Sequence, residues 1–271
     1  ISKVFQGLLM VSYRKVNTVD SFARLWIHEI SRVFYDRLVN VEDQQWFEAL
    51  VGELQGKSVG TSFDADEIFN EKPIMFVEFL KPGMEPEDRF YEEAKDVVQL
   101  RKLLDDSLFD YNSEFPTQMN LVFFTDAIKH VVRVSRLLRQ PRGNAMLIGV
   151  GGSGRQSTTR MAAFVGGMDL VGVVIVRGYG LNEFREDMKQ FMISAGVEGK
   201  PTVFLFTESQ IVLEDMLEDI NNMLNSGEIP NLYPQDELDK IVGDMFPICK
   251  ELGIPETRDS CLTTFVRRSR E

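Results

Sequence analysis

The chain has 271 residues, a formal net charge of −12, 44% hydrophobic residues and 27% charged residues. At about 100–200 residues per domain this length allows one large domain or two smaller ones, and the apolar content excludes disorder throughout. The negative charge disfavours a nucleic-acid binder with a broad basic face. No apolar run reaches the ~18 residues that a membrane helix needs, so no membrane partner is expected.

The class of protein is limited further by its cysteines, its histidines and the two ends of the chain. Cys249 and Cys261 are too few for a disulfide scaffold, which favours a reducing compartment. His28 and His130 lie far apart in the sequence, so no zinc or other metal site is predicted from them. The chain starts without a methionine or a signal-peptide pattern and stops within an expected helix. We therefore expect both ends to lie within a longer protein.

The first 50 residues are predicted to be helical. Between Asp20 and Leu38, apolar side chains recur at steps of three and four, which places them on one core-facing side of a helix. Thr18 or Asp20 is expected to cap its start. Residues 51–118 differ, because proline and glycine there punctuate short apolar pieces. This pattern predicts a linker region, with a domain boundary near residues 112–119.

From residue 119 onward the predicted elements alternate. Strands that alternate with helices imply crossover units and a parallel sheet flanked by helices. We therefore predict an α/β fold for residues 119–271, with residues 1–50 in a separate helical body. The expected helices span 126–138, 157–164, 181–195, 212–224 and 237–252, and the expected strands span 144–150, 170–176 and 202–207.

A glycine-rich segment follows the first of these strands and opens a helix. Its glycines allow backbone N–H groups to converge on an anion, and the helix adds its positive N-terminal end. Gly149 and Gly154 have the spacing of the P-loop pattern G-x-x-x-x-G-K-[ST]. The segment is therefore predicted to hold the phosphates of ATP or ADP. It comprises Gly149, Val150, Gly151, Gly152, Ser153, Gly154, Arg155, Gln156 and Ser157.

Two positions of this loop depart from the P-loop pattern. Arg155 stands where lysine is expected, and it keeps a positive charge that can fork onto phosphate oxygens. Gln156 stands where the magnesium-binding Ser or Thr is expected, and it offers only an amide oxygen. The hydroxyl of Ser157 comes one residue later, which turns it by about 100° on a helix. The loop therefore gives a magnesium ion less support than a standard P-loop does.

The same loop permits two other interpretations. Gly149, Gly151 and Gly154 also satisfy the dinucleotide pattern G-x-G-x-x-G. That pattern expects an acidic residue about 20 positions on, at the end of the second strand. Here that strand ends in Arg177, which would suit the 2′-phosphate of NADP. The glycines could also form a tight turn without a ligand.

The strand expected over 202–207 ends in Thr207 and Glu208. In a P-loop enzyme this strand usually ends in an Asp that supports magnesium and a Glu that orients the attacking water. Glu208 is therefore the candidate catalytic acid, whereas Thr207 replaces the magnesium-side carboxylate. The acids on the following helix are predicted to form a solvated outer face, and they are Glu214, Asp215, Glu218 and Asp219.

Several segments resemble a dynein heavy chain. The glycine loop with Arg-Gln-Ser is similar to the fourth AAA+ module of axonemal dyneins, and Val4–Leu9 resembles the small helical subdomain that closes the third module. The resemblance covers nearly all of the chain. Besides the loop, it rests on Asp126–His130, Gln140–Ala145, Gly178–Asp187 and Leu217–Asn231.

The resemblance implies a piece of a ring-shaped, microtubule-based motor in the cytoskeleton of cilia and flagella, the axoneme. In that family the first module does most of the ATP hydrolysis, and the third and fourth bind nucleotide and regulate. Residues 1–50 would be the lid of the preceding module, 51–118 a linker and 119–271 an incomplete P-loop large subdomain. Glu208 would face the water, and Leu121 and Val122 would flank the adenine.

The resemblance also implies partners. Neighbouring AAA+ modules of the same heavy chain would contact this one, while microtubules and the dynein intermediate and light chains would bind through regions outside it. The site itself is expected to bind nucleotide with weak or absent hydrolysis. Two alternatives stay open, namely a structural ring spacer with an empty site and an unrelated dinucleotide-dependent enzyme.

Overall fold

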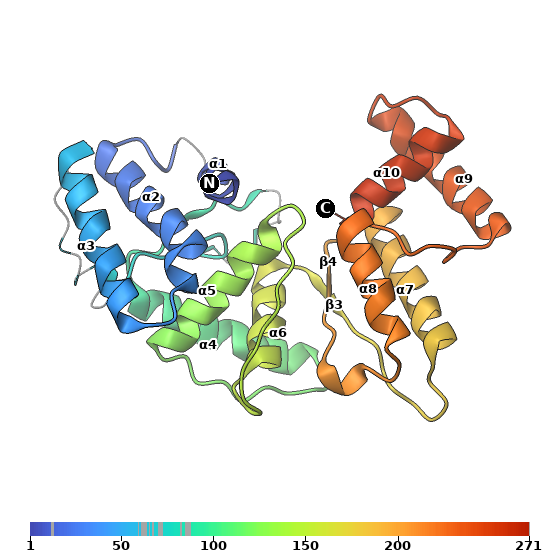
Figure 1. The fold of residues 1–271 in the computed structure, drawn as a ribbon, viewed down its shortest axis with the longest axis horizontal. Helices are drawn as coiled ribbons and strands as arrows, with labels where there is room; N and C mark the ends of the chain where they lie inside the picture. The colour runs from blue at the N-terminus through green and yellow to red at the C-terminus, as the bar shows by residue number, and fades with distance from the viewer. Residues whose placement is uncertain are drawn as a thin grey trace. The chain divides into compact units, whose positions relative to one another are not determined.

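The computed structural model describes residues 1–11, 14–58, 60, 64, 66, 68–69, 73–81, 83–84 and 88–270. Contacts divide the chain into two compact units (Figure 1). Unit 1 comprises Ile1–Gln140 and Gly149–Gly166, and unit 2 comprises Pro141–Ile148 and Gly167–Glu271. Parts of the predicted linker, and the last residue of the predicted large subdomain, lie outside the described residues. The predicted boundaries after residues 50 and 118 stay predictions.

Unit 1 begins with the helices α1 (Ser2–Leu9), α2 (Val19–Val33) and α3 (Val41–Ser58). Thr18 caps α2 as predicted, because its side chain accepts a hydrogen bond from the Ser21 N–H while the Ser21 hydroxyl accepts one from the Thr18 N–H. The helix ends at Val33, before the predicted Leu38, and a short 3₁₀ turn follows it.

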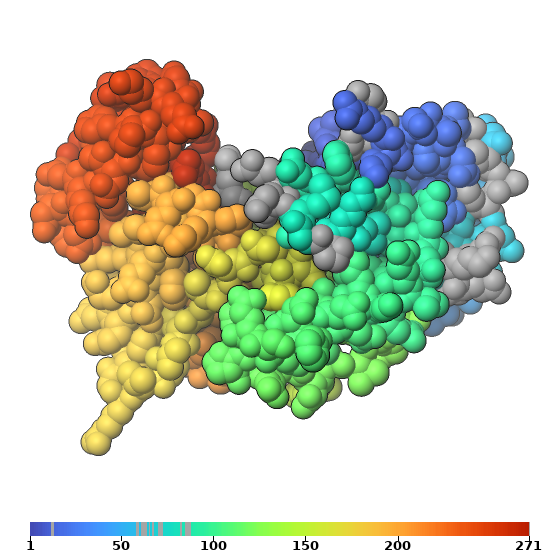
Figure 2. Space-filling view, turned by 180° about the vertical axis from the view of Figure 1, so that it is seen from behind, coloured from blue at the N-terminus to red at the C-terminus, as the bar shows by residue number. Residues whose placement is uncertain are grey.

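The remainder of unit 1 packs three helices against one another. A short antiparallel pair, β1 (Phe76–Val77) and β2 (Glu92–Glu93), precedes α4 (Val97–Glu114). Next come α5 (Thr125–Arg139) and α6 (Arg155–Gly166), which confirm the helices expected over 126–138 and 157–164. In the view of Figure 2, α4 and the segments before it cover this part of unit 1 in green and teal. The shared core includes Leu100, Leu104, Ile128, Val131, Met161 and Ala162.

Unit 2 is built on two parallel strands, β3 (Asp169–Val171) and β4 (Thr202–Phe204), in which Val171 lies opposite Phe204. The helices are α7 (Leu181–Gly196), α8 (Asp215–Ser226), α9 (Gln235–Glu251) and α10 (Arg258–Arg270). Figure 2 shows α9 and α10, in orange to red, gathered beside the lighter α7. Together these elements confirm a parallel α/β arrangement, although helices predominate. Within the described part of the chain, no helix is long and apolar enough to cross a membrane.

All three of the predicted strands need correction. The prediction of a strand over 144–150 is wrong, because these residues, all of them described, form no ladder. Their apolar side chains are exposed, as Met146 at 87% and Ile148 at 83% show. An apolar run becomes a strand only when a neighbouring strand supplies hydrogen bonds, and the described residues pair no strand with this one. The strands expected over 170–176 and 202–207 are present at those places, but they end earlier, at Val171 and at Phe204.

Candidate functional site

The predicted phosphate loop is an open turn in front of α6. Gly152 and Gly154 have φ values of 78° and 75°, in the left-handed region that favours glycine. Around Gly151, Gly152 and Gly154, open space lies where a Cβ atom would stand among the described residues. Helix α6 begins at Arg155, so its first N–H groups lack intrahelical acceptors and face the loop. The loop therefore offers exposed backbone donors to an anion.

Arg155 lies along its own loop. Its Nη2 atom donates a hydrogen bond to the carbonyl oxygen of Val150 at 3.2 Å, and the Ser153 N–H donates to the same oxygen at 3.2 Å. A Cβ atom on Gly149 would stand 3.6 Å from Cδ of Arg155. Because a guanidinium group has five N–H donors, others remain for an anion while this contact holds the side chain at the loop.

The next residues belong to an anchored helix. Gln156 is exposed and Ser157 is half-buried. The hydroxyl of Thr159 donates to the Arg155 carbonyl at 2.9 Å, and Met161 is fully buried against the core of unit 1. The start of α6 is therefore held by packing, while the Gln156 amide remains accessible from solvent.

The predicted adenine-flanking pair lies in the same unit as the loop. Leu121 packs against the core of unit 1, whereas Val122 is 79% exposed. The next residue, Phe123, is buried and anchors this stretch in front of α5. Contact of Leu121 and Val122 with adenine stays a prediction.

Glu208 lies just beyond β4, in unit 2. It is the first residue of a short 3₁₀ turn, Glu208–Gln210, and its side chain is exposed. The glycine loop belongs to unit 1, so joint action of the loop and Glu208 stays a prediction.

Gln210, which the sequence analysis did not single out, connects the strand ends of unit 2. Its Oε1 accepts hydrogen bonds from the N–H of Thr207 at 2.7 Å and from the Thr207 hydroxyl at 2.9 Å. Its Nε2 donates to the carbonyl oxygen of Val173 at 2.6 Å. The sequence indicates Gln210 only by its place two residues after a candidate catalytic acid. It does not reveal that the amide binds Val173 across the sheet.

A second feature missed from the sequence is a buried polar network that joins α2 to α5. Glu29 on α2 is fully buried and forms an ion pair with Arg136 on α5. The hydroxyl of Tyr91 donates to Glu29 Oε1 at 3.0 Å and lies 3.0 Å from Nε2 of His28. Gly7 of α1 lies against this pair, since a Cβ atom there would stand 2.8 Å from Arg136 Nη2. The network therefore connects α1, α2 and α5 inside unit 1.

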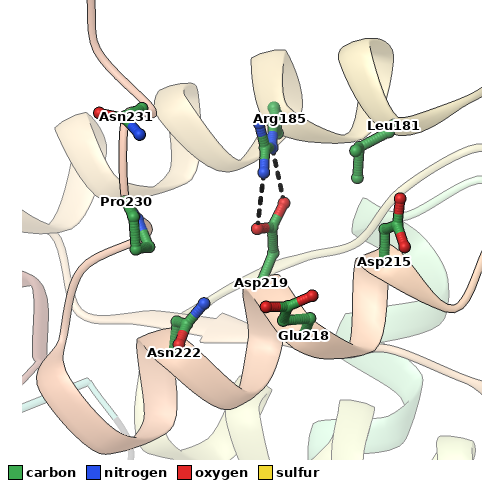
Figure 3. A pocket seen from close by; sticks show the side chains of 8 residues that line it. All are labelled: Leu181, Arg185, Asp215, Glu218, Asp219, Asn222, Pro230 and Asn231. Carbon is green, nitrogen blue, oxygen red and sulfur yellow. Dashed lines mark hydrogen bonds and ion pairs between the residues drawn. The ribbon is translucent and has the colours of Figure 1, made fainter.

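Unit 2 also contains a cavity of about 300 Å³ between α7, α8 and the segment after α8 (Figure 3). Arg185 reaches across it and binds Asp219 with two contacts, at 2.7 and 3.0 Å. The prediction that Asp219 lies on a solvated face is wrong, because Arg185 allows its carboxylate to be buried. None of the predicted site residues lines this cavity, whose walls are Leu181, Arg185, Asp215, Glu218, Asp219, Asn222, Pro230 and Asn231.

Comparison with known proteins settles the family. Residues 119–271 match the family described as "P-loop containing dynein motor region D4", and residues 1–69 match the AAA+ lid domain. The chain belongs to the dynein heavy-chain family. A P-loop AAA+ fold with a helical lid is thereby confirmed, as is the predicted resemblance to axonemal members.

The similar heavy chains are named as axonemal or flagellar. The chain is 44% identical over 272 residues to dynein axonemal heavy chain 6 of Homo sapiens, and 42% identical over 272 residues to the dynein-1-beta heavy chain of the flagellar inner arm I1 complex of Chlamydomonas reinhardtii. It is 40% identical over 271 residues to the flagellar outer arm dynein alpha chain of the same alga. These alignments cover 99–100% of this dynein segment but only 6% of each relative.

Proposed function

We propose that this dynein segment is a regulatory module of a ciliary motor and binds ATP or ADP. The observation that carries the proposal is the open glycine loop, with positive φ at Gly152 and Gly154 and with α6 directly behind it. Backbone donors and a helix N-terminus together favour a phosphate group. In this proposal the stretch from Gly149 to Ser157 holds the phosphates, and Leu121 and Val122 flank the adenine.

The same residues favour binding over hydrolysis. A magnesium ion at such a site neutralises charge on the phosphates. Gln156 has an amide where a magnesium-binding hydroxyl is expected, and Thr207 has a hydroxyl where a carboxylate is expected. Loss of these magnesium-supporting groups raises the activation free energy of hydrolysis more than it weakens nucleotide binding. We therefore propose weak or absent hydrolysis, with Glu208 as the acid that would orient water.

The place of the segment in its parent protein is part of the proposal. The lid match before residue 69 and the P-loop match after residue 119 suit the end of one AAA+ module followed by the start of the next. We propose that these are the third and fourth modules of a ring, in the axoneme of a cilium or flagellum. Neighbouring modules are the direct partners, and microtubules and the intermediate and light chains bind through other regions of the heavy chain.

Equilibrium binding of ADP and ATP to the assembled parent heavy chain tests the proposal, with the other nucleotide sites blocked by substitution. Arg155→Ala is expected to weaken binding by about 1.5–3 kcal/mol, or roughly 10- to 150-fold, the range for hydrogen bonds to charged groups. Arg160→Ala is the matched control, since five residues along α6 turn a side chain by about 140°. Absence of bound nucleotide in the unchanged motor would favour the structural spacer instead.

A further inference from the structure

The parallel ladder of unit 2 is interrupted at its carboxyl end. Val171 lies opposite Phe204, and the N–H of Leu205 donates to the carbonyl oxygen of Val171 at 2.9 Å. In a parallel pair with this register, the next bond of that kind would run from the N–H of Thr207 to the carbonyl oxygen of Val173. The amide of Gln210 stands between these two groups instead, and it bonds to both, at 2.7 Å and 2.6 Å.

This arrangement is more than a cap on the 3₁₀ turn. A cap needs only an acceptor, and Oε1 of Gln210 fills that role by accepting from the N–H and the hydroxyl of Thr207. The donor Nε2 serves a different purpose, because it reaches the other strand at Val173. The side chain of Val173 is only 4% exposed, so the anchor lies in the core of unit 2.

Glu208 lies in the chain between Thr207, which this amide binds, and Gln210, which carries the amide. Thr207 precedes it and Gln210 follows it by two positions, so its backbone is held on both sides by one side chain. Because an amide with two hydrogen bonds replaces a single ladder bond, it also separates the two backbones where the strands end. Glu208 itself remains exposed, which suits a group that acts on water rather than one that packs.

We propose that Gln210 is a positioning residue for Glu208. It fixes the carboxylate at the common end of β3 and β4 by joining Thr207 to Val173. This inference rests on the proposed function, in which Glu208 orients the water that attacks a bound nucleotide.

The test uses the assembled parent heavy chain with hydrolysis at all other modules disabled. Single-turnover hydrolysis of ATP is followed over hours, and nucleotide affinity is measured separately. Gln210→Met keeps the length of the side chain but removes both hydrogen-bonding arms. We expect it to slow turnover about 10- to 100-fold, the effect of a small misplacement, with unchanged affinity. In a motor that already carries Glu208→Gln, Gln210→Met should cause no further loss.

Gln235→Met is the matched control, because Gln235 is an exposed glutamine of unit 2 whose amide, among the described residues, bonds to Asp239 alone. It should leave the rate unchanged. An equal loss from Gln210→Met with and without Glu208 would overturn the inference, since it would indicate general damage. Unchanged turnover in Gln210→Met would overturn the inference while the proposed nucleotide binding stands. So would an unchanged motor that hydrolyses ATP no faster than the Glu208→Gln motor does. Failure of the unchanged motor to bind nucleotide would overturn the proposed function as well.

Discussion

His28 and Tyr91 form a buried chain of hydrogen bonds that has fewer protons than acceptors. Nδ1 of His28 lies 3.0 Å from the carbonyl oxygen of Ile74, and a carbonyl only accepts, so Nδ1 carries the proton. In the neutral ring Nε2 is then an acceptor. The single hydroxyl proton of Tyr91 is donated to Glu29 Oε1, so that hydroxyl supplies no proton to Nε2 although the two atoms lie 3.0 Å apart.

Burial lowers the pKa of His28 well below its usual 6.5, and the nearby Arg32 lowers it further. The folded chain therefore keeps His28 neutral at pH values where the unfolded chain binds a proton. Stability from this residue is complete above about pH 6.5 and falls as the pH drops toward the lowered pKa, by about 1.4 kcal/mol per pH unit. Urea unfolding at pH 7.5 and pH 5.5 measures this loss.

The control for this prediction is the other histidine. His28→Gln can keep both hydrogen bonds without titrating, so it should reduce the acid destabilisation. His130 is exposed on the surface of α5, and burial lowers its pKa less markedly, so His130→Gln should preserve most of the effect. Equal pH dependence in the unchanged chain and in His28→Gln would contradict the assignment.

At the scale of the elements, helices α2 and α5 are joined by a buried ion pair. Glu29 is completely buried and the side chain of Arg136 is 8% exposed. Arg136→Met should destabilise the chain by about 3–5 kcal/mol, because it leaves a carboxylate buried without its partner. Urea unfolding of the chain measures the change.

An exposed ion pair provides the comparison. Arg258→Met removes the same side chain from a pair with Asp239, in which both members are about half exposed, at 44% and 56%. This change should hardly shift the urea midpoint, because water already screens the pair. If the two variants behaved alike, the α2–α5 pair would have no special role in holding the lid helices to α5.

Helices could be predicted from the sequence more completely than the site could. The periodic pattern of α5 and the Thr18 cap of α2 are local, so neighbouring residues in the sequence decide them. The burial of Asp219 depends on Arg185, one helix away. Gln210 likewise has a role only because Val173 lies across the sheet, and a single sequence does not display such distant partners.

At the scale of the whole molecule, the chain matches only a short stretch of the heavy chains that it resembles. It spans 6% of the heavy chains that it resembles, and its loop and Glu208 belong to different compact units. A nucleotide bound at the loop would reach α5 through its packing on α6, and α5 is tied to the lid helices by Glu29 and Arg136. In the proposed function, nucleotide binding would therefore bias a connection between two AAA+ parts, which suits regulation.

The proposed function also predicts slow hydrolysis of ATP at this site. With Gln156 and Thr207 in the positions that usually support magnesium, single-turnover hydrolysis at this site should be well below the ~1–100 s⁻¹ typical of phosphoryl-transfer enzymes such as kinases. Loss of one positioned electrostatic group in other enzymes costs ~10²–10³ in rate, and here two positions differ. The measurement uses the parent motor with its other modules disabled. A rate within that enzyme range, abolished by Glu208→Gln, would instead make this module a working ATPase.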